Sequence, residues 1–101
     1  MITLIRSSVF VSWLGGLSDA KGKARVLAQI NRAAFGNFGD CDSVGEGVSE
    51  MRVHYGPGYR VYFTQEGATI YVLLCGGNKS TQRRDIAKAK RMARDLKEKK
   101  P

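Results

Sequence analysis

The sequence is poor in residues that bind metals or form disulfides. It has one histidine and two cysteines, Cys41 and Cys75, which lie far apart and form no CxxC motif. Because zinc sites normally combine such ligands at short spacings, we expect no metal site. The pattern does not require a disulfide, and reduced thiols are the simpler interpretation.

Long apolar stretches are also missing. The longest unbroken one, Ile70 to Cys75, is far too short to span a bilayer, which takes about 20 residues. Residues 9–17 resemble the apolar part of a signal peptide, but Ser12 and two glycines interrupt them and only Arg6 precedes them as a positive charge. We therefore expect a helix there, and a cytoplasmic protein without a membrane partner.

Several catalytic signatures are absent. The chain has no P-loop, no GxGxxG motif and no pattern typical of a Ser-His-Asp triad. A single histidine also excludes an acid–base pair made of two histidines. We therefore expect no small-molecule cofactor, and any reaction has to use the charged and polar side chains that are present.

Negative charge is scarce and unevenly distributed. Nine acidic residues stand against 17 basic ones, which gives a net charge of +8. From Lys79 onward ten basic residues accompany three acidic ones, a net of +7, whereas residues 1–78 carry seven and six, a net of +1. This excess favours a polyanionic partner such as a nucleic acid or an acidic protein. A solvated basic helix that serves solubility would have the same composition, so the counts leave both interpretations open.

Hydrophobic periodicity predicts an α+β protein. Ser7 or Ser8 and then Asp19 are suitable N-caps for two early helices, and Ser80 or Thr81 for a last one. Period-two alternation around short turns predicts an antiparallel β-meander. We expect a single domain, residues 1–101, of order β-α-α-β-β-β-α with the helices on one face of the sheet. The predicted elements are a strand at 2–5, a helical hairpin at about 8–35, a loop at 36–47 with room for a short strand, strands at 48–55, 59–65 and 69–75, and a C-terminal helix.

The predicted hairpin around Gly56-Pro57-Gly58 carries the most informative side chains. If Met51 and Val53 face the helices, the alternate residues of both strands face the other way. Each of these residues alone fits an ordinary solvated sheet face. Together, two arginines, a histidine, a tyrosine and a carboxylate indicate a site that handles phosphate. The residues are Glu50, Arg52, His54, Arg60 and Tyr62, with Lys79 at the rim.

Such a set suits RNA cleavage in which the 2′-hydroxyl attacks the adjacent phosphate. The reaction needs a base, a proton for the leaving oxygen and positive charge on the phosphoryl oxygens. Histidine is the residue type best suited to proton transfer at physiological pH, so His54 suits either proton transfer, and Glu50 is the alternative base. Arg60 and Arg52 suit phosphate binding through paired hydrogen bonds. Tyr62 or Tyr59 could stack on a base.

At these residues the chain resembles the HigB-like addiction-module killer proteins of the RelE/ParE toxin superfamily. The similarity extends over nearly the whole chain, from Trp13-Leu14 to the last helix. Four motifs in the same order carry it: Gly36-Asn37-Phe38-Gly39-Asp40, Gly45-Glu46-Gly47-Val48-Ser49-Glu50-Met51-Arg52, Gly56-Pro57-Gly58-Tyr59-Arg60-Val61-Tyr62, and Leu73-Leu74-Cys75-Gly76-Gly77-Asn78-Lys79-Ser80-Thr81-Gln82 with Asp85-Ile86.

The resemblance implies a type II toxin that a helix-turn-helix antitoxin from the same operon neutralises. It implies a RelE-like compact α+β fold and, for the RelE/HigB branch, metal-independent mRNA cleavage on the translating ribosome. Basic residues would then meet ribosomal RNA, mainly through its phosphates. They are Lys21, Lys23 and Arg25 near the start of the second helix and Arg83, Arg84, Lys90 and Arg94 on the last helix.

The family's catalytic residues carry over in part. Arg60 matches the phosphate-binding arginine, Arg52 falls where a basic strand residue is frequent, and Lys79 matches a basic residue after the third strand. Glu50 stands where RelE has a lysine, and no tyrosine follows Lys79 to match RelE's C-terminal catalytic one. His54 lies beside a turn that is one residue longer. Two alternatives stay open: a ParE-type gyrase inhibitor, and a module that binds nucleic acid or antitoxin without catalysis.

Overall fold

Five strands form one mixed sheet in the computed structural model, which describes residues 1–99. Their spatial order is β1-β5-β4-β3-β2, and β1 (Thr3–Arg6) runs parallel to β5 (Ile70–Gly77). The predicted meander is confirmed as β3 (Val48–Val53), β4 (Tyr59–Gln65) and β5. The short strand for which the loop had room is β2 (Cys41–Gly45), paired antiparallel with β3 at one edge.

The helices begin close to the predicted caps. The Ser7 side chain accepts a hydrogen bond from the Phe10 amide at 3.0 Å at the start of α1 (Ser8–Gly15). The Asp19 carboxylate accepts one from the Gly22 amide at 2.9 Å at the start of α2 (Ala20–Ala33). The last cap agrees with the prediction in position only. Asn78 caps a 3-10 turn, η1 (Lys79–Thr81), which leads into α3 (Gln82–Glu98), and Thr81 stands at the N-cap of α3 without a capping side-chain bond.

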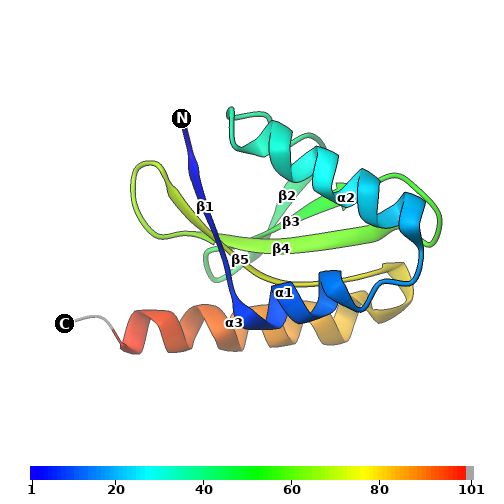
Figure 1. Cartoon of the computed structure of the whole chain (residues 1–101). Helices are drawn as coiled ribbons and strands as arrows, with labels where there is room; N and C mark the ends of the chain where they lie inside the picture. Colours follow the sequence, from blue (N-terminus) through cyan, green and yellow to red (C-terminus); the bar gives the residue numbers. More distant parts are fainter. Residues whose placement is uncertain (100–101) are drawn as a thin grey trace.

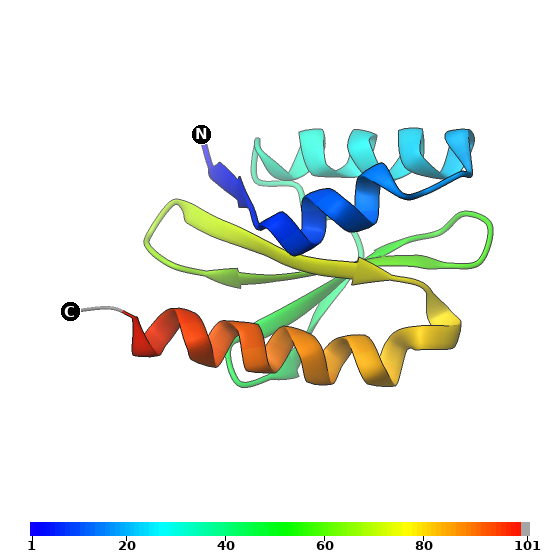
Figure 2. The same cartoon turned by 60° about the horizontal axis from the view of Figure 1, so that its bottom comes forward.

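The helices cover both faces of the sheet, not one as predicted (Figure 1). After a rotation, α1 and α2 lie above the sheet and α3 lies below it (Figure 2). Two buried cores follow. Phe10, Val26 and Met51 belong to the core under α1 and α2, whereas Tyr62 and Ala89 belong to the core under α3. The prediction failed because an amphipathic helix shows which of its faces is buried but not which face of the sheet it covers.

The three strands of the predicted meander alternate as predicted, with one interruption, which lies in β5. Tyr62 pairs with Cys75 and Phe63 with Leu73, so Leu74 is an extra residue that forms a β-bulge. Leu74 and Cys75 consequently both join the core under α3.

Candidate active site

Glu50 is the centre of the polar hairpin residues. Its side chain is 1% exposed, and Oε2 accepts hydrogen bonds from the Tyr62 hydroxyl at 2.9 Å and from Gln82 Nε2 at 2.8 Å. The same carboxylate lies 3.3 Å from Arg52 Nε and 3.4 Å from Arg60 Nε. The predicted outward orientation was right in direction, but α3 covers this part of the face, so Glu50 and Tyr62 are buried instead of solvated.

The sheet register explains why a buried carboxylate is needed here. Arg52 and Arg60 are directly paired neighbours on β3 and β4. Like charges in such a pair repel each other, and Glu50 compensates both. Arg60 Nε is buried and makes no hydrogen bond, so the Glu50 ion pair provides its electrostatic compensation.

The two tyrosines expected to stack on bases are both buried. Tyr62 is 0% exposed, and burial together with the Glu50 hydrogen bond raises its pKa far above the usual range. Its hydroxyl therefore stays protonated and donates to Glu50. Tyr59 is 5% exposed and donates to Asp19 Oδ2 at 2.8 Å. In this structure neither ring offers a face to a base.

Arg52 and His54 share an acidic partner from the preceding loop. Arg52 donates to Asp40 Oδ1 at 2.9 Å and to Asp42 Oδ2 at 2.8 Å. His54, whose side chain is 73% exposed, places Nε2 2.7 Å from Asp40 Oδ2. The hydrogen bond with His54 and the charge of Arg52 lower the pKa of Asp40, which keeps this carboxyl ionised at neutral pH. Arg52 is thus occupied by acidic side chains, whereas His54 is accessible.

Arg60 and Lys79 meet at the β3–β4 turn. The Arg60 Nη1 donates to the Gly58 carbonyl at 2.9 Å, and the Lys79 amide donates to the Pro57 carbonyl at 3.3 Å. Gly58 has a positive φ of 76°, which disfavours any side chain, and a Cβ there would lie 3.3 Å from Arg60 Nη1 and 3.5 Å from the Lys79 Cβ. Three candidate residues therefore lie at one end of the sheet. His54 follows β3, Arg60 is near the start of β4, and Lys79 follows β5.

Comparison with known proteins identifies the family. The model of the phage-derived protein Gp49-like family (DUF891) matches residues 12–97. The chain belongs to this family. Gp49-like proteins are toxins of toxin–antitoxin addiction modules, which gives the chain an antitoxin as a partner. An uncharacterized protein of Haemophilus influenzae (strain ATCC 51907 / DSM 11121 / KW20 / Rd) is 48% identical over 87 residues, covering 86% of this chain and 88% of that protein.

The remaining basic residues of this Gp49-like protein lie in two different environments. Lys21, Lys23 and Arg25 stand at the start of α2, at the same end of the molecule as the β3–β4 turn and η1 (Figure 1), and Arg25 lies over the Tyr55 ring at 4.9 Å. Arg83 and Arg84 are exposed at the start of α3. Lys90 and Arg94 instead reach Glu46 on the β2–β3 turn, at 3.9 and 2.7 Å.

Sequence reasoning assigned no role to four polar residues of the Gp49-like site. Gln82 belongs to the last of the four motifs, and that membership was the available signal. Asp40 ends the first motif, but its contact with His54 depends on how the loop folds back. Nothing in the sequence pattern singled out Asp42. Asp85 is 5% exposed, accepts from the Thr81 hydroxyl at 2.5 Å and lies against Gly77, where a Cβ would overlap it.

The described part of this Gp49-like chain contains neither a metal-binding cluster nor a membrane-spanning helix. Among residues 1–99, no group of three or more histidine, cysteine, aspartate or glutamate side chains is placed to hold a metal ion. None of the helices in that range is long and apolar enough to cross a membrane.

Proposed function

We propose that this chain is the toxin of a type II module that cleaves mRNA on the translating ribosome, as a HigB-like member of the RelE/ParE superfamily. It acts in the cytoplasm as a single domain, without a metal or cofactor, and a helix-turn-helix antitoxin neutralises it. The observation that carries the proposal is the buried Glu50 carboxylate, which pairs with Arg60 at the end of the sheet where the exposed residues His54 and Lys79 also lie.

The proposed reaction is an internal transfer of the phosphate. The 2′-oxygen attacks the phosphorus, the bond to the 5′-oxygen breaks, and the products are a 2′,3′-cyclic phosphate and a 5′-hydroxyl end. Arg60 and Lys79 place positive charge where the phosphoryl oxygens become more negative. His54 takes the proton from the 2′-hydroxyl, and the Lys79 ammonium group supplies the proton for the leaving oxygen.

Asp40 supports this role for His54. An ionised carboxylate can only accept a hydrogen bond, so Nε2 of a neutral His54 carries the hydrogen that points to Asp40 Oδ2. The other ring nitrogen, Nδ1, is then the free acceptor. Asp40 also stabilises the imidazolium ion that forms when His54 takes up a proton, as the carboxylate of a catalytic triad does.

Glu50 is better suited to positioning than to proton transfer. It is 1% exposed and receives hydrogen bonds from Tyr62 and Gln82, so it has no direct access to a substrate. It instead holds Arg60 in one orientation, which reduces the reorganisation needed in the transition state. Arg52 then acts as part of this framework, because its donors are directed at Asp40, Asp42 and Glu50.

In this proposal the ribosome positions the mRNA, which the shallow site of the toxin does not do alone. The cations at the start of α2 and Arg83 and Arg84 on α3 are exposed or half-exposed and suit phosphate contacts that orient the toxin without reading sequence. Lys90 and Arg94 can contribute once RNA phosphates compete with Glu46. Charge reversal at both residues should weaken ribosome association, and a sedimentation assay would measure this.

The proposal is tested by inducing the toxin in cells without antitoxin and mapping mRNA 5′ ends. We expect growth arrest and new in-frame cuts in translated messages. Arrest with intact mRNA and altered DNA supercoiling would instead support a gyrase inhibitor. An absence of arrest would overturn the toxin assignment and leave a binding module.

Two variants connect the cleavage to the site. His54→Gln should lower the cleavage rate by about 10²- to 10⁴-fold, the usual contribution of a positioned acid or base. Arg60→Ala should lower it by about 10²- to 10³-fold. Arg6→Ala, at an exposed arginine on β1, is the control and should cleave normally. Because His54 is 73% exposed, its substitution does not threaten folding, and normal cleavage by His54→Gln would refute the assignment.

A further inference from the structure

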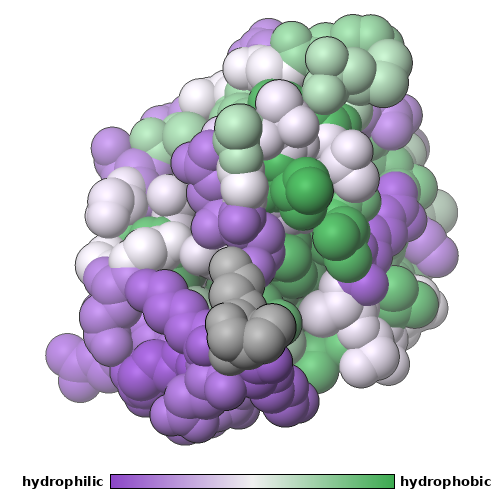
Figure 3. All heavy atoms as spheres, turned by 90° about the vertical axis from the view of Figure 1, so that its left-hand side faces the viewer, coloured by the Kyte–Doolittle hydropathy of each residue, from purple (hydrophilic) through white to green (hydrophobic). Residues whose placement is uncertain are grey.

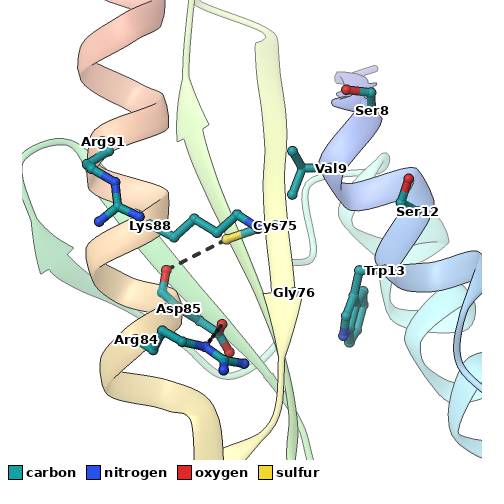
Figure 4. A pocket seen from close by; sticks show the side chains of 10 residues that line it. All are labelled: Ser8, Val9, Ser12, Trp13, Cys75, Gly76, Arg84, Asp85, Lys88 and Arg91. Carbon is teal, nitrogen blue, oxygen red and sulfur yellow. Dashed lines mark hydrogen bonds and ion pairs between the residues drawn. The ribbon is translucent and has the colours of Figure 1, made fainter.

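A cleft of about 730 Å³ lies between α1, β5 and α3, apart from the residues of the proposed active site. Figure 4 shows side chains from α1 and α3 pointing into it from both sides of β5. Ser8, Val9, Ser12 and Trp13 come from α1, and Cys75 and Gly76 form the floor. The α3 side presents Arg84, Asp85, Lys88 and Arg91.

A second hollow of about 190 Å³ continues the cleft along α3. At three places in the chain, one residue lines one hollow and its neighbour in sequence lines the other. These pairs are Ser7 and Ser8, Leu74 and Cys75, and Arg91 and Met92. The bulge in β5 makes this continuity possible, because Leu74 and Cys75 both lie on the α3 side of the sheet. We call the combined feature the α1–α3 groove.

The α1–α3 groove changes character along its length. One stripe of α3 lines it, at spacings of three and four residues that keep side chains on one helix face. Its first part is cationic, and its second part has the apolar side chains Val72, Leu74, Met92 and Leu96, with Asp95 and Lys99 at the border. Figure 3 shows apolar surface in the middle of the face where β1 and the C-terminal end of α3 lie, above the hydrophilic end of α3.

Within the part of the chain that the structure describes, the cations of the groove are neutralised only in part. Among residues 1–99, Lys88 and Arg91 have no ion pair within 4.0 Å. Arg84 is 78% exposed and lies 3.8 Å from Asp85. A complementary ligand therefore has negative charge at one end and apolar side chains at the other.

We infer that the α1–α3 groove binds a segment of the antitoxin that has acidic residues at one end and apolar residues at the other. The inference rests on the toxin–antitoxin function and adds the surface and the chemistry of the contact. A peptide segment fits better than RNA, because the second half of the groove is mainly apolar and offers phosphate only Lys99 at its border, next to Asp95. None of His54, Arg60 and Lys79 lines the groove, so the segment would hold the toxin without covering those three residues.

The test is a calorimetric titration of the purified toxin with the antitoxin encoded in the same operon, without ribosomes. The double variant Lys88→Glu/Arg91→Glu should bind about 10- to 100-fold more weakly, because two attractive contacts become repulsive. The matched control Arg83→Glu/Lys97→Glu makes the same change of charge on exposed α3 residues outside the groove, and it should bind within about threefold of the unsubstituted toxin.

Three results would overturn the inference. The first is an equal loss of antitoxin binding in both double variants. The second is a groove variant that binds the antitoxin normally but no longer binds a labelled single-stranded RNA. The third is that the unsubstituted toxin does not bind the antitoxin. Because the titration contains no ribosome or mRNA, its result does not depend on nuclease activity. A toxin that cuts no mRNA but shows the expected loss would fail the proposed function and support the groove.

Discussion

The two faces of the sheet are built from different kinds of residues. The face under α1 and α2 has a core of side chains such as Phe10, Val26 and Val61, all fully buried. The face under α3 buries a second apolar core together with the polar side chains Glu50, Thr64 and Asp85. The mainly apolar face under α1 and α2 depends on close packing, and it also buries Gln29, whose Nε2 donates to the Arg52 carbonyl at 2.8 Å. Every buried polar group needs such a partner, and the face under α3 has more of them.

This difference indicates a division of labour. Burying charge is unfavourable unless partners compensate it, so the Glu50 network is a weak source of stability. Its effect is to fix two arginines that would otherwise repel each other. We therefore expect the apolar face to determine whether the protein folds, and the α3 face to determine whether it cleaves RNA.

The largest expected effect is on the apolar face. Phe10→Ala should lower the free energy of unfolding by about 3–5 kcal/mol, because it removes a fully buried ring and leaves a cavity. Urea denaturation measures it. Val11→Ala on the same helix, at a side chain that is 52% exposed, should change stability by about 0.5 kcal/mol or less. Similar losses for the two variants would contradict the stabilising role of the buried Phe10 ring in the core under α1 and α2.

A smaller effect on stability, with a large effect on activity, is expected for Glu50→Gln. Glutamine fills the same volume and keeps an acceptor for Tyr62, so the free energy of unfolding should fall by about 1–3 kcal/mol. Loss of the charge releases Arg60, and the cleavage rate should fall about 10²-fold. Thr64→Val, which removes a buried hydrogen bond to the Gly47 carbonyl on the same face, is the control and should retain cleavage. Retained cleavage by Glu50→Gln would contradict the positioning role.

The smallest effect is a pH dependence shared by both faces. Asp19 has its pKa lowered from 3.8 by hydrogen bonds from the Gly22 amide and Tyr59, and Asp40 by His54 and Arg52. In the unfolded chain the pKa of both carboxyls returns to 3.8. As the pH falls, the unfolded chain therefore takes up protons before the folded chain does. The free energy of unfolding should fall as pH drops through 3.8 toward the folded pKa values, and be constant for these groups above it. Urea denaturation from pH 2 to 6 measures the slope, which Asp19→Asn/Asp40→Asn should reduce. An unchanged slope would contradict the lowered pKa values.

Much of the fold was predictable because its signals are local. The Ser7 and Asp19 caps and the alternation of Met51 and Val53 with Glu50 and Arg52 depend on residues a few positions apart. The side on which α3 packs was not predictable in this way. Solvated and covered polar faces have the same alternation, and only the tertiary structure shows that Glu50 is buried.

The sequence predicted the residues of the site better than it predicted the contacts between them. Alternation placed Arg52, Arg60 and His54 on one face, and the resemblance singled out Arg60. The contact of Asp40 with His54 spans 14 residues and depends on the path of the loop before β2. Gln82 reaches Glu50 across 32 residues, a separation at which periodicity carries no information.

The extra residue in β5 also has a consequence for comparing relatives. Up to Leu73 the strand presents odd-numbered residues to α1 and α2, and after the bulge Gly76, an even-numbered residue, takes that side against Trp13. Deletion of Leu74 would restore a uniform alternation and leave the residues that follow on their present sides. Gly77 would still leave room for Asp85. A homologue that is one residue shorter between β4 and η1 is therefore expected to have lost the bulge, and its alignment with this chain needs its gap at Leu74 instead of in the neighbouring turn.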